Sequence, residues 1–196
     1  RDGSKEESSM LRELVRRLRS AGLLPRSRVG VALSGGPDST AAALLARDLS
    51  FLLGYPPPLC VVVEHGIRDG SKEEADKVAE HAIRLGLDAQ VHSIAHLLRG
   101  SGKAVQERAR AERYDALTTA ASKEGCDQVW TGHHRDDAVE TTLFRLLRHS
   151  SWQGLASIDY ARTLYAPDGR QLQLIRPLLP HTKVRAMPQL FEWNNT

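Results

Sequence analysis

Aromatic residues, cysteines and long apolar runs are all scarce in this sequence. Of its 196 residues, 5% are aromatic and two are cysteines, Cys60 and Cys126, each inside an apolar segment. This excludes a disulfide-rich scaffold and predicts two buried thiols in a reducing compartment. No stretch approaches the roughly 20 apolar residues that cross a bilayer, and the first residues lack the pattern of a secretion signal. We therefore expect a soluble protein with no membrane partner.

The residues that are present suit one globular domain. Hydrophobic residues make up 41% of the chain, which excludes a wholly disordered protein. The length fits a single domain, since domains usually run to about 100–200 residues. Lys and Arg number 27 against 24 Asp and Glu, so the net charge is +3. This charge permits a polyanionic partner but is too small to predict one.

Short apolar runs alternate with helical patterns along the chain. Most of the predicted strands are nearly continuous in apolar residues, and the pattern typically passes through a turn into a helix. This alternation is typical of an α/β fold, here a parallel sheet of about five strands with helices on both faces, and it places a ligand at the carboxyl ends of the strands. The predicted strands are 28–34, 59–66, 88–94, 127–133 and 171–178, and the predicted helices are 10–20, 40–50, 71–86, 106–124 and 136–148.

A glycine turn separates the first predicted strand from its helix, and it reads Ser34-Gly35-Gly36-Pro37-Asp38-Ser39-Thr40. The two glycines let the backbone approach a phosphate, and the following helix offers unpaired N–H groups at the positive end of its dipole. The turn has neither the lysine of a Walker loop nor G-x-G-x-x-G spacing. An ordinary turn with Asp38 or Ser39 as the helix N-cap is the alternative. The turn alone leaves both interpretations open.

The segment 131–148 gathers histidines and carboxylates where a predicted strand meets a helix. His133 and His134 end the strand, and Asp137 and Glu140 share one face of the helix. Carboxylate oxygens suit Mg²⁺ held against the phosphates of a ligand. Acidic residues in a first helical turn are also favoured by the helix dipole without any further function, so capping is the alternative.

The segment 106–117 carries cations on one helix face. Gln106, Arg110 and Arg113 recur at helical spacing, while Tyr114 marks the buried face. A line of guanidinium groups can bind the phosphate groups of a ligand. The alternative is a solvated face paired with neighbouring glutamates.

The segment 62–75 ends a strand with Glu64, His65 and Gly66. The carboxylate there could orient an amine or bind a metal, whereas a lone buried histidine is more often a satisfied core residue. Ser71 and Glu74 have the spacing of a capping box and predict the start of the next helix.

Together these segments resemble a known family. The turn SGGPDS resembles the pyrophosphate loop of the N-type ATP pyrophosphatase superfamily. The segments VVEHGIRDGSKEEA, QERARAERYDAL and TGHHRDDAVETTLFRLLR, followed by GLASI and RPLL, resemble the motifs of the tRNA(Ile)-lysidine synthetase family in the same order. The resemblance implies a Rossmann-like, adenine nucleotide alpha hydrolase-like fold that uses ATP and Mg²⁺. It also implies a ligase that adenylates the wobble cytidine of tRNA(Ile) with a CAU anticodon and joins L-lysine to it, releasing pyrophosphate and AMP.

The resemblance assigns roles to residues at the matching positions. The implied catalytic residues are Asp38, Arg113, His133, Asp137 and Glu140. The implied nucleotide-binding residues are Ser34, Gly35, Gly36, Pro37, Asp38, Ser39, Glu64, His65, Gly66 and Arg110. The implied metal ligands are Asp38, Asp137 and Glu140. The family's usual location is the cytoplasm, with a mitochondrion or plastid as the alternative.

The chain also departs from the family pattern. Glu64 stands where many members have Asp, and residues 149–153 replace a glycine-containing loop. We expect a disordered segment over 1–9, a pyrophosphate-loop catalytic domain over 10–180, and a divergent, truncated tail over 181–196. Two alternatives follow: an ATP-binding truncated homologue without catalysis, and a pyrophosphate-loop tRNA thiolase, which the two isolated cysteines disfavour. Nothing in the sequence predicts an oligomeric state.

Overall fold

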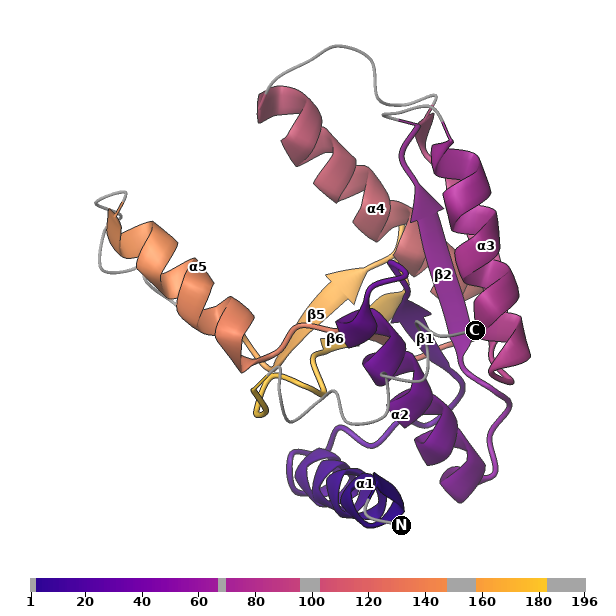
Figure 1. The fold of residues 1–196 in the computed structure, drawn as a ribbon, viewed down its shortest axis with the longest axis vertical. Coiled ribbons are helices and arrows are strands. Elements are labelled where there is room, and N and C mark those ends of the chain that lie inside the picture. The colour runs from indigo at the N-terminus through magenta and orange to yellow at the C-terminus, as the bar shows by residue number, and fades with distance from the viewer. Residues whose placement is uncertain (1–2, 67–69, 96–102, 148–157, 183–196) are drawn as a thin grey trace.

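The computed structural model describes residues 3–66, 70–95, 103–147 and 158–182 (Figure 1). Its helices are α1 (Gly3–Ser20), α2 (Pro37–Leu53), α3 (Ser71–Arg84), α4 (Lys103–Lys123) and α5 (Arg135–Leu147). Its strands are β1 (Val29–Ala32), β2 (Leu59–Glu64), β3 (Asp88–Ser93), β4 (Gln128–Trp130), β5 (Ala161–Tyr165) and β6 (Gln171–Ile175). Within these ranges, no helix combines the length and the apolar character that crossing a membrane requires.

The strands form one sheet in the order β3-β2-β1-β4-β6-β5. All neighbouring pairs are parallel except β5 and β6, which confirms the predicted α/β class. The sheet has six strands rather than about five. The sequence pattern does not predict β5, because this edge strand, ARTLY, is mostly exposed and has no continuous apolar run.

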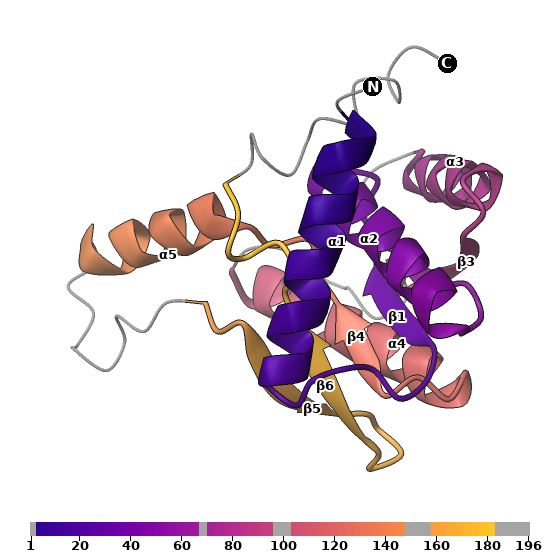
Figure 2. The same cartoon turned by 90° about the horizontal axis from the view of Figure 1, so that it is seen from below.

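Helices cover both faces of the sheet, but unevenly. Helices α1, α2 and α3 pack on one face, against buried side chains such as Val31 and Trp130. Helix α4 packs on the opposite face, where Leu117 meets Val129. Figure 2 shows α1 in front of the sheet and α4 behind it, with α5 pointing away from both layers. Two side chains of α5, Val139 and Leu143, are accordingly exposed.

Strand order determines where a ligand can bind. After β1 the chain moves outward to β2 and β3, and it then returns to place β4 on the other side of β1. At such a reversal the connections after neighbouring strands diverge to opposite faces and leave a crevice at the carboxyl edge. The turns that follow β1 and β4 border this crevice.

Two local predictions are wrong. Helix α1 begins at Gly3, so residues 3–9 are helical rather than disordered; this stretch has no apolar residue, but its Lys5, Glu6 and Glu7 are good helix formers that extend the helix toward the N-terminus. The capping box at Ser71 and Glu74 does not form. Gly70 is the N-cap of α3, at φ +83°, and the Ser71 hydroxyl instead donates to the Glu64 carboxylate. A buried carboxylate competes for that hydroxyl more strongly than the helix end does.

Candidate functional site

A cavity of about 650 Å³ lies at the carboxyl ends of β1, β2 and β4. Segments far apart in sequence form its walls, including the turns after β1 and β4, the end of β2 and one face of α4. Nine of the predicted site residues line it, namely Ser34, Gly36, Asp38, Ser39, Glu64, His65, Arg110, Arg113 and His133. The predicted position of the ligand and the observed cavity therefore coincide.

The glycine turn is held in shape by its own hydroxyl groups. The Ser39 hydroxyl donates to the carbonyl of Gly36 at 2.9 Å and accepts hydrogen bonds from the backbone and the hydroxyl of Ser34. Gly36 is the N-cap of α2, with Pro37 after it and no side chain capping the helix. The alternative in which Asp38 or Ser39 is the N-cap is therefore wrong, and the helix end remains available to an anion.

Two glycines permit close backbone approaches around this turn. Gly35 has φ +78°, and a Cβ atom there would lie 2.6 Å from Val78 of α3. Gly132 follows β4, and a Cβ atom there would lie 2.5 Å from the carbonyl oxygen of Asp38. Larger residues at either position would push the turn away from its neighbours.

His134 connects the two turns that border the crevice. Its Nε2 lies 3.7 Å from Oδ1 of Asp38, and its Nδ1 lies 3.4 Å from Oδ2 of Asp137. The side chain of His134 is only 6% exposed. The sequence analysis assigns a role to His133 but not to His134, because the sequence does not show which of two adjacent histidines points toward the first turn. In the structure β4 lies beside β1, and this places His134 next to Asp38.

Asp137 also caps helix α5. Its Oδ2 accepts a hydrogen bond from the backbone N–H of His134 at 2.8 Å, and its own N–H approaches Nδ1 of that residue. This is the reciprocal pattern of a capping box. Capping, which the sequence left open, is thus realised at Asp137, whose side chain is still 34% exposed beside the crevice.

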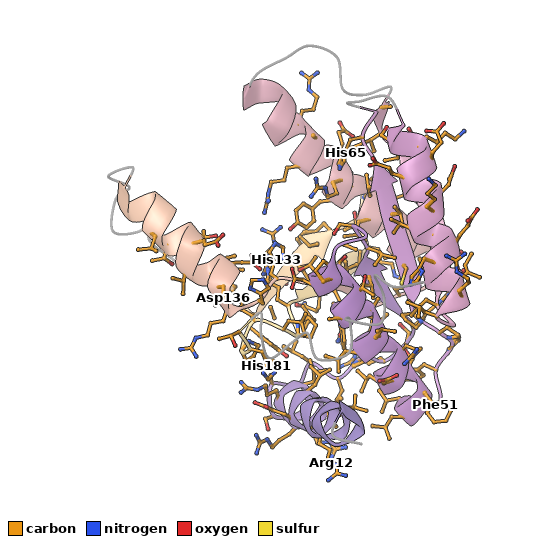
Figure 3. The ribbon with its side chains drawn as sticks, viewed as in Figure 1. Arg12, Phe51, His65, His133, Asp136 and His181 are labelled. Atoms are coloured by element: carbon orange, nitrogen blue, oxygen red, sulfur yellow. The ribbon has the colours of Figure 1, made fainter. Side chains whose placement is uncertain are left out.

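Two neutral imidazoles lie in the cavity wall (Figure 3). Burial lowers the pKa of His133, and the charges of Arg176 and Arg110 add to this while Asp137 opposes it. Burial and Arg113 lower the pKa of His65 in the same way. Arg113 donates a hydrogen bond to Nε2 of His65 at 3.1 Å. The Nδ1 atom of His65 is buried and has no hydrogen-bond partner among the described residues.

Glu64 is buried and its carboxylate is already engaged. It accepts hydrogen bonds from the hydroxyls of Ser71 and Ser93, both at 2.5 Å, and from the backbone of Gly66. These bonds, led by that from Ser71, lower the pKa of Glu64. The carboxylate thereby joins the ends of β2 and β3 to the start of α3. We interpret it as a group that positions the cavity wall.

The remaining predicted residues lie outside the cavity lining. Asp137 and Glu140 lie on α5, where Glu140 is exposed; Pro37 is the first residue of α2, and Gly35 and Gly66 lie in the turns after β1 and β2. The side chain of Gln106 and the loop 149–153 are outside the described part of the chain. Among the residues that the structure does describe, no three His, Cys, Asp or Glu side chains gather as a metal site, so Glu140 does not join Asp38 and Asp137.

Both cysteines are structural. Cys60 packs among the helices of one sheet face and Cys126 on the opposite face. Burial raises the pKa of Cys60 to about 12 and that of Cys126 to about 11. Thiols in this state are poor nucleophiles, and the sheet separates them.

The fold and the cavity define a class of protein. A parallel sheet with a glycine turn and an open helix N-terminus at its switch point belongs to the α/β proteins that bind phosphates at this position. Within that class, the chain belongs to the PP-loop domain family, whose model matches residues 6–194.

Similar sequences and structures agree with this assignment. A tRNA(Ile)-lysidine synthase of Novosphingobium aromaticivorans is 41% identical over 160 residues, which is 79% of this chain and 45% of that protein. One from Bradyrhizobium sp. is 41% identical over 167 residues, 82% of this chain and 43% of that protein. The chain therefore spans less than half the length of these relatives.

Two solved structures share the fold. The U34-tRNA thiolase NcsA of Methanococcus maripaludis, with its [4Fe-4S] cluster, has a TM-score of 0.66 at 18% identity and covers 92% of this chain and 62% of its own. The NAD⁺ synthetase of Burkholderia pseudomallei has a TM-score of 0.53 at 17% identity, with 95% and 73% covered. At these identities the likeness concerns the fold.

Proposed function

We propose that this protein is an ATP-dependent ligase that joins L-lysine to the wobble cytidine of tRNA(Ile) with a CAU anticodon. The observation that carries the proposal is the cavity at the carboxyl ends of β1 and β4. Its walls combine the glycine turn, which is held by its own hydrogen bonds, with the arginines of α4. Relatives that match about 80% of this chain bear the name of that activity. The whole reaction is stated as a proposal because the chain matches less than half the length of those proteins.

The first step is adenylation of the cytidine. The C2 oxygen of the base attacks the α-phosphorus of ATP, and the bond to the β,γ-pyrophosphate breaks. The glycine turn supplies backbone N–H groups and the positive end of α2 to the departing pyrophosphate. Arg110 and Arg113 face the same cavity from α4 and offset the negative charge that the phosphates bring.

The second step is attack by the amine of lysine at C2, with AMP as the leaving group. The amine must lose a proton during this attack. The imidazole of His133 is neutral at pH 7 because burial and nearby arginines lower its pKa, so it can accept a proton. Asp137, partly exposed at the edge of the crevice, can attract the cationic substrate.

Asp38 is a carboxylate of the cavity lining that suits a magnesium ion beside the glycine turn. Mg²⁺ is usually held by one or two carboxylates together with substrate phosphates. Asp38 would hold the ion, which when bound would neutralise charge on the phosphates. Asp137, which the resemblance also implies as a ligand, contacts the other ring nitrogen of His134 and lies outside the lining. Glu140, which the resemblance implies as a third ligand, is exposed on α5 and takes no part here.

A tRNA thiolase and an inactive ATP-binding homologue are the competing functions. The cysteines are buried on opposite sheet faces, which disfavours a thiolase that uses them. An inactive homologue would bind ATP without transferring lysine. We expect the protein to work in the cytoplasm, as proposed from the family resemblance.

Incubation of the chain with ATP, Mg²⁺, labelled lysine and a tRNA(Ile) transcript tests the proposal. We expect label in the tRNA and AMP in equal amount, with a full-length relative as positive control. Asp38→Asn should abolish incorporation, whereas Asp48→Asn, on the solvent side of the same helix, should not. ATP binding without incorporation by the wild type would select the inactive homologue.

A further inference from the structure

Three arginines from separate elements lie around the side chain of Tyr114 on α4. The guanidinium of Arg110 lies 5.5 Å from the ring centroid and that of Arg162, on β5, lies 5.1 Å from it. Arg176, which follows β6, also interacts with Tyr114 and is buried, with 5% of its surface exposed. We call Arg110, Arg162 and Arg176 with Tyr114 the arginine cluster.

Within the described part of the chain, no carboxylate oxygen lies within ion-pair distance of the arginine cluster. Burial lowers the pKa of Arg176, and the nearby charge of Asp159 opposes this only in part. Nη1 of Arg176 donates to the carbonyl of Asp159 at 2.5 Å, while its buried Nε has no hydrogen-bond partner among the described residues. Burying a guanidinium donor without a partner is unfavourable, and an anion at the cluster would relieve this cost.

The arginine cluster adjoins the cavity but extends beyond it. Arg110 and Tyr114 line the cavity, and Arg110 and Arg176 both lower the pKa of His133. Arg162 is exposed and lies outside the lining. The glycine turn leads into α2 on one face of the sheet, whereas the cluster is built on α4 and the β5–β6 hairpin. The cavity therefore has two separate anion-attracting walls.

We propose that the arginine cluster binds the phosphodiester backbone of the RNA substrate beside the nucleotide that enters the cavity. The glycine turn is the site suited to the phosphates of ATP, and a small nucleotide does not require cations outside the cavity. An RNA strand is a continuous polyanion, and it contacts cations beyond the cavity once one of its nucleotides lies inside. This inference rests on the proposed function for the identity of the RNA.

Tyr114 is the positioning residue of this cluster. Its ring attracts guanidinium groups through its quadrupole and holds two of them that would otherwise repel each other. The ring thereby restricts the conformations of these arginine side chains and keeps their guanidinium groups close together. The β5–β6 hairpin, which the sequence pattern did not predict as a pair of strands, supplies two of the three cations.

The test compares RNA and ATP binding in three variants of this chain. The RNA probe is a labelled anticodon stem-loop of tRNA(Ile), measured by fluorescence anisotropy over a series of salt concentrations, and ATP is measured by calorimetry. Arg162→Ala removes an exposed cluster member, and Arg162→Lys restores its charge. Arg12→Ala is the control, since Arg12 is exposed on α1 far from the cavity (Figure 3).

We expect Arg162→Ala to weaken RNA binding about fivefold at 0.1 M salt and to reduce the slope of log affinity against log salt by about 0.7. ATP affinity should not change, Arg162→Lys should recover the slope, and Arg12→Ala should match the wild type. The inference is overturned if Arg162→Ala leaves RNA binding unchanged, or if it weakens ATP binding instead. Failure of the proposed function is a separate outcome. In that case Arg162→Ala still binds RNA more weakly than the wild type, but the wild type incorporates no lysine into tRNA.

Discussion

The backbone of Gly132 packs directly against the carbonyl group of Asp38. A Cβ atom on Gly132 would lie 2.5 Å from that oxygen and 2.6 Å from the amide nitrogen of Ser39. The turn after β4 and the start of α2 can therefore approach only because residue 132 has no side chain. The residues of this contact, Gly132, Asp38 and Ser39, line the cavity of the candidate site.

Gly132→Ala should destabilise the fold by about 1–3 kcal/mol, because backbone atoms rather than a flexible side chain would have to move. It should also weaken ATP binding, since the displaced atoms belong to the glycine turn and α2. Thermal unfolding and calorimetry measure the two effects. Gly22→Ala is the control: Gly22 has φ +66° but open space around it, so only stability should fall.

His134→Ala should reduce lysine incorporation at least tenfold while the protein stays folded. The imidazole contacts Asp38 and Asp137 from two different elements, and without it the two carboxylates lose the group that holds them in place. A fall in kcat larger than the change in KM for ATP is expected. His92→Ala, at a half-buried histidine of the edge strand β3, is the matched control and should keep full activity. Equal losses in both variants would contradict a positioning role for His134.

Glu64→Gln should destabilise the protein by about 1–3 kcal/mol at pH 7, because an amide nitrogen would replace an oxygen that accepts a hydrogen bond. Hydrogen bonds lower the pKa of Glu64 below its ordinary value of 4.5. Its contribution to stability is therefore complete above pH 4.5 and is lost as the pH falls through the folded-state pKa. Denaturant unfolding from pH 7 to pH 3 should show a steeper loss in the wild type than in Glu64→Gln. Parallel curves would contradict this assignment.

The double variant Cys60→Ala and Cys126→Ala should keep lysine incorporation. Both thiols are buried, with pKa values raised to about 12 and about 11, so neither is reactive near pH 7. Iodoacetamide should accordingly label the native protein far more slowly than the unfolded protein. Loss of activity in a folded double variant would instead favour the thiolase alternative.

Local sequence patterns predict most of the elements of this fold. Continuous apolar runs such as LCVVV mark buried parallel strands, and the spacing of glycines and helix formers marks the elements that follow them. Edge strand β5 lacks such a pattern because most of its side chains are exposed, so its positions do not need apolar residues. Helix α1 extends further than predicted because charged helix formers leave its beginning without a clear boundary.

The candidate site was predictable only in part. The glycine turn could be recognised because both its geometry and its chemistry depend on consecutive residues. Glu64 could be placed at a strand end, but its partners Ser71 and Ser93 lie 7 and 29 residues away, and no local rule predicts such pairing. The arginine cluster is a similar case, since it joins α4 to a hairpin about 50 residues further along the chain.

The sequence by itself determined the class of fold, the glycine turn and the inventory of phosphate-binding and carboxylate groups, because these follow from the chemistry of neighbouring residues. The tertiary structure decided which of those groups meet. Strand β4 lies beside β1, and this alone brings His134 to Asp38 and Gly132 to the start of α2. The same arrangement leaves Glu140 exposed on α5. Such pairings depend on the order of strands in the sheet, which is set by packing across the whole core.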